Sequence, residues 1–68
     1  MDVYLILVDL AKLATATGKG TYSITDYACG FIPFKNGENK VSEVGTSFLS
    51  IARWLLDEIE GKLKEETQ

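Results

Sequence analysis

The chain has 68 residues, of which 46% are hydrophobic, with one cysteine, no histidine and a formal net charge of −3. A domain this small buries only about 60% of the surface that its unfolded chain exposes, so its high apolar content favours oligomerisation as a further source of stability. The acidic balance argues against a general nucleic-acid binder. The absence of histidine excludes Ser-His and Cys-His nucleophilic pairs and the common zinc sites.

Residues 2–17 predict a first helix that is buried on most of its sides. On a helical wheel, Asp2, Asp9 and Lys12 gather on one narrow stripe, and nearly all other positions are apolar. Gly18 follows the last periodic residue, as is typical of a helix end. Leu5 lies on the polar stripe, which indicates a contact surface, although a single exposed leucine is also common.

The middle of the chain shows only short periodic patterns. Residues 21–24 are β-branched and aromatic and predict a short extended segment. Ser23-Ile-Thr-Asp26 matches a capping box, so we expect a short helix over 24–30 that stops near Gly30. Pro33 prevents helix continuation. The pair Asn36-Gly37 signals a hairpin only between two strand-like runs, and the sequence after it is helical, so we expect a loop there.

Residues 40–63 predict one long amphipathic helix, followed by a frayed tail at 65–68. Its apolar positions include Phe48, Leu55 and Ile59, which we expect to form the core with Leu7, Leu10 and Ala14 of the first helix. On a wheel with Glu43 at 0°, the apolar arc runs from about 80° to 200°, and three further positions, Gly45, Leu49 and Leu56, extend it to about 240°. The expected fold is therefore a single mainly α domain, residues 1–68, with three helices and a short extended segment between the first two.

Trp54 interrupts the polar face of this long helix. It falls among Ser47, Ser50 and Gly61 on the wheel. One interpretation is that another segment folds over this face, because tryptophan is usually largely buried. The other is that Trp54 anchors a partner or a second copy of the chain, with Leu5 and the small neighbours Ser47, Ser50 and Gly61 completing the interface.

No catalytic residue, cofactor site or metal site is expected. Cys29 stands alone and predicts a small buried hydrophobe. The carboxylates Asp57, Glu58 and Glu60 predict a solvated face; a carboxylate-only hydrolase is the minor alternative. Neither GxxxxGK[ST] nor GxGxxG is present. We expect no signal peptide and no membrane span, and a lone cysteine suits the reducing cytoplasm.

The order of elements around Gly18-Lys-Gly-Thr-Tyr-Ser-Ile-Thr-Asp-Tyr-Ala28 resembles the opening of winged-helix and helix-turn-helix domains. In that family a helix ended by glycine is followed by a short strand and a capped second helix. The resemblance covers residues 3 to 55 and implies that the helix after Lys40 occupies the recognition position. It also implies candidate nucleic-acid contacts, which are Lys19, Lys35, Lys40, Thr46 and Arg53.

Two functions follow as expectations. The first is a non-enzymatic protein-interaction or regulatory module that acts as a homo-oligomer, most simply a homodimer, and binds a second copy or another protein. The alternative is a helix-turn-helix-like DNA-binding transcriptional regulator, which the net charge disfavours.

Overall fold

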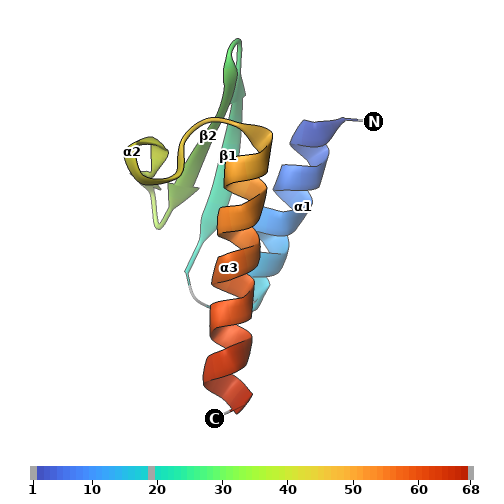
Figure 1. Ribbon diagram of the computed structural model, residues 1–68, viewed down its shortest axis with the longest axis vertical. Helices are drawn as coiled ribbons and strands as arrows, with labels where there is room; N and C mark the ends of the chain where they lie inside the picture. Colours follow the sequence, from blue (N-terminus) through green and yellow to red (C-terminus); the bar gives the residue numbers. More distant parts are fainter. Residues whose placement is uncertain (1, 19, 68) are drawn as a thin grey trace.

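A computed structural model describes the backbone of residues 2–18 and 20–67 and the side chains of residues 2–18 and 20–61. In chain order the elements are α1 (Val3–Ala16), β1 (Tyr22–Tyr27), β2 (Gly30–Lys35), β3 (Glu38–Asn39), α2 (Val41–Val44) and α3 (Phe48–Thr67). The three strands form one antiparallel sheet in the order β1-β2-β3 (Figure 1). The fold is therefore α+β, and the expectation of a mainly α domain is wrong.

The first helix lies where the sequence predicts it. The backbone N–H of Tyr4 donates to the Asp2 carboxylate at 3.0 Å, which caps the start of α1. At the other end, Gly18 takes a φ of 92° and its N–H donates to the carbonyl of Thr15. A left-handed residue of this kind is cheapest as glycine, so the helix stops where its periodicity stops.

The short helix expected over 24–30 is absent, and those residues form most of a β-hairpin. Tyr22 and Ile24 are buried while Ser23 and Thr25 are exposed, which is the two-residue period of a half-buried strand. The pairing runs from Tyr22 opposite residue 35 to residue 27 opposite residue 30. A capping box is a local signal of about 1 kcal/mol, and pairing with the apolar run 31–34 outweighs it.

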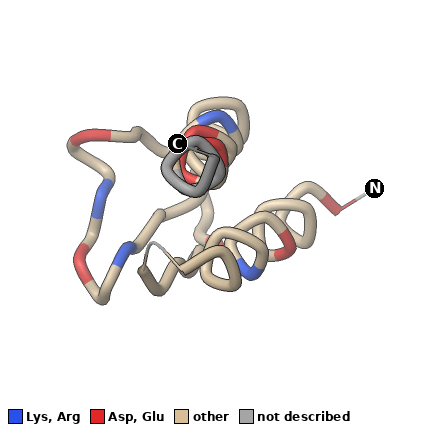
Figure 2. Tube along the Cα trace, turned by 90° about the horizontal axis from the view of Figure 1, so that it is seen from below, with Lys and Arg blue, Asp and Glu red and all other residues tan. Residues whose placement is uncertain are grey.

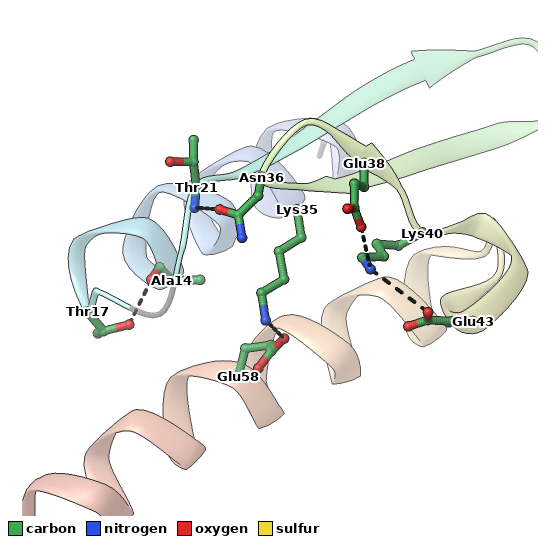
Figure 3. Close-up of polar contacts among 9 residues, drawn as sticks. All are labelled: Ala14, Thr17, Thr21, Lys35, Asn36, Glu38, Lys40, Glu43 and Glu58. Carbon is green, nitrogen blue, oxygen red and sulfur yellow. Dashed lines mark hydrogen bonds and ion pairs between the residues drawn. The ribbon is translucent and has the colours of Figure 1, made fainter.

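Asn36 and Gly37 form a tight turn between β2 and β3, so the expected loop is wrong. Their φ angles are 54° and 82°, and two successive positive values define the type I′ hairpin turn that Asn-Gly favours. The Asn36 side chain also accepts a hydrogen bond from the backbone N–H of Thr21 at 3.0 Å, which ties the turn to the start of β1 (Figure 3).

The long helix expected over 40–63 is broken at Gly45, whose φ is 92°. The four-residue α2 ends there, and α3 starts afresh after Ser47, whose hydroxyl accepts a bond from the backbone N–H of Ser50 at 3.2 Å. The expected frayed tail, 65–68, falls at the end of α3, where Gln68 and the side chains from residue 62 onward lie outside the described residues.

The core lies between α1, β1 and α3. Figure 1 shows α1 and α3 side by side and running in the same direction, and α1 also packs against β1. The buried core cluster consists of Leu7, Ala11, Ala14, Tyr22, Ile24, Ile51, Leu55 and Ile59, and Pro33 of β2 is buried as well. The predicted core positions Leu7, Ala14, Leu55 and Ile59 are among them, and Leu10 and Phe48 pack against them in partly buried positions.

Side chains of α1 cover the free edge of β1. Thr15 accepts a bond from the backbone N–H of Tyr22 at 2.9 Å, and the Tyr4 hydroxyl donates to the carbonyl of Ile24 at 3.2 Å. An uncovered strand edge is a template for pairing with another chain. Two side chains three helical turns apart thus occupy outward-facing backbone groups of this edge.

The far edge of β2 is also covered. β3 pairs with its last residues, Phe34 and Lys35. Near its start, the backbone N–H of Phe31 donates to the carbonyl of Thr46 at 3.0 Å, which brings the segment between α2 and α3 onto the sheet. A Cβ at Gly30 would lie only 2.7 Å from this carbonyl oxygen, so the close approach requires glycine at that position.

Candidate functional site

A shallow, largely apolar surface lies on the outer face of α3, which we define as Leu49, Ser50, Ala52, Arg53 and Leu56. These residues line a shallow groove of about 500 Å³ on the side of α3 away from Ile51 and Leu55. Leu49 is 76% exposed and Leu56 is 48% exposed. Their spacing, with Ala52 between them, is three and then four residues, which is the spacing of a coiled-coil seam.

The structure places the predicted interface residues in several different surroundings. The ring of Trp54 meets the ring of Tyr22 edge-on, with 5.5 Å between centroids and an interplanar angle of 66°. Trp54 is thus partly buried against the core, as the first interpretation of this residue expects. Leu5 is 56% exposed on α1. The remaining three residues are Ser47 and Ser50, whose hydroxyls are 2.9 Å apart at the start of α3, and Gly61, which is half-buried.

Leu49 and Leu56 are exposed apolar residues that the predicted interface does not include. The signal was the width of the apolar arc, because one packing surface needs an apolar stripe of only about 100°. An arc about 160° wide leaves apolar positions beyond those that one packing surface covers. The predicted interface is centred on Trp54 instead. In the structure, Tyr22 of β1 packs against Trp54 and covers that face of α3.

A second cluster joins β1, β2 and α3. The ammonium of Lys35 lies 2.9 Å from the Glu58 carboxylate (Figure 3). It also lies 5.5 Å from the centroid of the Tyr22 ring. The Tyr22 hydroxyl is buried, with no hydrogen-bond partner among the described residues. Burial, and then the charge of Glu58, raises the pKa of Tyr22, while the hydrogen bond to Glu58 raises the pKa of Lys35. Both groups therefore keep their protons near neutral pH, which suits an ion pair that joins elements and not a proton-transfer site.

The basic residues expected to contact nucleic acid do not form one surface. Lys35 pairs with Glu58, and Lys40 lies 3.2 Å from Glu38 and 3.9 Å from Glu43. Basic and acidic segments alternate along β2, β3 and α2 in Figure 2. The other candidates are scattered: Arg53 lies on the outer face of α3, Thr46 uses its carbonyl to hold Phe31, and Lys19 lies outside the described residues.

The resemblance to winged-helix domains required a second helix at 24–30, and a β-hairpin occupies that stretch. The helix that should have occupied the recognition position is also divided at Gly45. The fold therefore lacks the pair of consecutive helices on which the resemblance depended.

Cys29 is exposed in the turn between β1 and β2, so the expectation of a buried hydrophobe is wrong. In the part of the chain that the structure describes, no three metal-ligating side chains gather into a potential metal site. Within the same part, none of the helices combines the length and apolarity that crossing a membrane demands.

Comparison with protein-family models, with curated proteins and with solved structures gives no significant match. The function must therefore be argued from the geometry of this chain.

Proposed function

We propose that this chain is a non-enzymatic interaction module that forms a homodimer through the outer face of α3. The observation that supports the proposal is the pair of exposed leucines on that face, Leu49 and Leu56, on either side of the half-buried Ala52. Exposed apolar positions that recur at coiled-coil spacing on one helix are typical of a surface that packs against another helix.

A second copy is the occupant that best matches this face. In a two-fold dimer the same patch is used twice, so each leucine is buried in both copies. Removing these side chains from water would contribute on the order of 5 kcal/mol in total, given their exposure and the usual value for a buried leucine. Association costs at least about 4 kcal/mol in lost motional freedom, so we expect a reversible dimer with a weak dissociation constant.

The contacts along the edges of β1 and β2 favour the helical route over strand addition. Tyr4 and Thr15 occupy outward-facing groups of β1, and β3 with Thr46 covers the far edge of β2. A partner that extends the sheet would first have to displace these contacts. The outer face of α3 needs no such displacement, because Leu49 is already 76% exposed.

Sedimentation equilibrium over a wide concentration range tests the proposal. The variants Leu49→Ser and Leu56→Ser should each weaken dimerisation and leave the circular dichroism spectrum unchanged, since neither side chain belongs to the buried core. Leu5→Ser is the matched control, because Leu5 is a leucine of similar exposure on α1. A wild-type chain that stays monomeric throughout, or a control that weakens the dimer as much as Leu49→Ser does, would contradict the proposal.

A further inference from the structure

The outer face of α3 carries one basic and one acidic residue on the same flank. Arg53 and Glu60 are both exposed. They are seven residues apart, which is about two helical turns and roughly 10.5 Å along the axis. On the helical wheel they differ by only about 20°, and both lie to the same side of the line from Leu49 to Leu56. Asp57, which is also exposed, lies further round the helix.

We propose that the two copies pair their α3 helices antiparallel, with Arg53 of each copy beside Glu60 of the other. This inference rests on the proposed homodimer and specifies its geometry. Leu56 stands about midway between the two charges, so the two-fold axis passes close to it. Leu56 of each copy then packs near the axis at the centre of the contact, Leu49 lies roughly 11 Å from the axis toward each end, and the two ion pairs lie along one rim.

Charge complementarity selects the antiparallel arrangement. A two-fold axis perpendicular to α3 reverses the helix direction, so it brings position 53 of one copy to the level of position 60 of the other. Opposite charges then meet twice. In a parallel pair the axis runs along the helices, so each residue lies level with its own copy but on the opposite rim, and neither Arg53 nor Glu60 meets the other's charge. Charges at the rim set orientation, so only the antiparallel pair gains from these two residues.

A charge-reversal cycle tests the pairing, with the dimer dissociation constant measured by sedimentation at low salt. Arg53→Glu and Glu60→Arg should each weaken the dimer by roughly tenfold, as expected when two exposed ion pairs become two repulsive pairs. The double variant restores both pairs in reversed order, so its dissociation constant should return to within about threefold of the wild type. Asp9→Arg is the matched control: it makes the same change in net charge as Glu60→Arg at an exposed position of α1, away from the proposed contact, and should leave the constant nearly unchanged.

The outcomes separate this inference from the function on which it rests. If the dimer depends on Leu49 but neither single reversal weakens it, the antiparallel pairing is wrong and the homodimer stands. A parallel dimer gives this result, because Arg53 and Glu60 of one copy then lie on the opposite rim from those of the other. If the double variant is as weak as the single variants, the pairing is also wrong. A wild-type chain that is monomeric at every concentration overturns both.

Discussion

The buried hydroxyl of Tyr22 allows a test of how much an unpaired polar group in the core lowers the free energy of unfolding. This oxygen has no hydrogen-bond partner among the described residues, although the ring around it packs against Trp54. A buried polar group without a partner costs about 1–3 kcal/mol. Tyr22→Phe removes that oxygen and keeps the ring, so the variant should be as stable as the wild type or more stable.

Tyr4 provides the matched control, because its hydroxyl does have a partner. It donates to the carbonyl of Ile24 at 3.2 Å, and its ring stacks on Phe31 with 6.3 Å between centroids. Tyr4→Phe keeps the stacking and loses the hydrogen bond, which should cost about 1 kcal/mol. For Tyr22→Phe we expect a gain of about 1 kcal/mol, the low end of the penalty, because nearby Lys35 and Glu58 partly solvate the oxygen.

Thermal unfolding followed by circular dichroism measures both variants. With an unfolding entropy of about 2.1 cal/mol/K per residue, 1 kcal/mol shifts the Tm of a chain this long by about 7 °C. Tyr22→Phe should therefore melt higher than the wild type and Tyr4→Phe lower. A Tyr22→Phe variant that loses as much stability as Tyr4→Phe would refute the reasoning, since it would mean that the Tyr22 hydroxyl is well satisfied in solution.

Three further predictions follow from the packing and the charges. Leu55 is fully buried, so Leu55→Ala should cost about 2–5 kcal/mol and leave so small a domain largely unfolded by circular dichroism; a cooperative melt near the wild-type Tm would exclude Leu55 from the core. Gly30→Ala brings a Cβ to 2.7 Å from the Thr46 carbonyl oxygen, whereas Gly37→Ala meets no atom within 4 Å, so the first should lower the urea midpoint more than the second. The raised pKa values of Lys35 and Tyr22 mean that the folded chain holds these protons more tightly than the unfolded chain, so the stability that these two groups contribute should be constant from neutral pH to about pH 10 and should be lost above it, which lowers the Tm. Phenylalanine at position 22 should make that fall shallower, and an identical fall in wild type and variant would count against the linkage.

The parts of the fold that the sequence predicts correctly are those with a strong, continuous local signal. The first helix has fourteen residues, a capping aspartate and a terminal glycine, and its bounds differ from the prediction by one residue at each end. Core residues at helical spacing, such as Leu7 and Leu55, are predicted for the same reason. Here local periodicity and the tertiary contacts agree.

The hairpin could not be predicted in this way because its stability is not local. Ser23-Ile-Thr-Asp26 satisfies a helix cap and a strand alternation equally well, and only pairing with 31–34 decides between them. The Asn36-Gly37 turn was discounted because the residues after it looked helical, yet two paired residues, Glu38 and Asn39, suffice to make it a hairpin. At the candidate site, the width of the apolar arc is the sequence signal for exposed apolar residues such as Leu49 and Leu56. Trp54 is the more conspicuous residue on the helical wheel, and it directs the interface prediction to a different face of the helix.

Because the side chains that cover the edge of β1 come from α1, protection of that edge depends on the attachment of this one helix. Tyr4 and Thr15 belong to α1, which also supplies Leu7 and Ala11 to the core. A fluctuation that detaches α1 would therefore expose the strand edge and the apolar core at the same moment. A partly opened molecule of that kind exposes an unpaired strand edge and an apolar surface, and both promote aggregation through strand pairing. The lifetime of the α1 contact thus sets how often a folded copy exposes its β1 edge and its core. The rate at which α1 detaches is therefore the quantity that governs how long the protein stays unaggregated at high concentration.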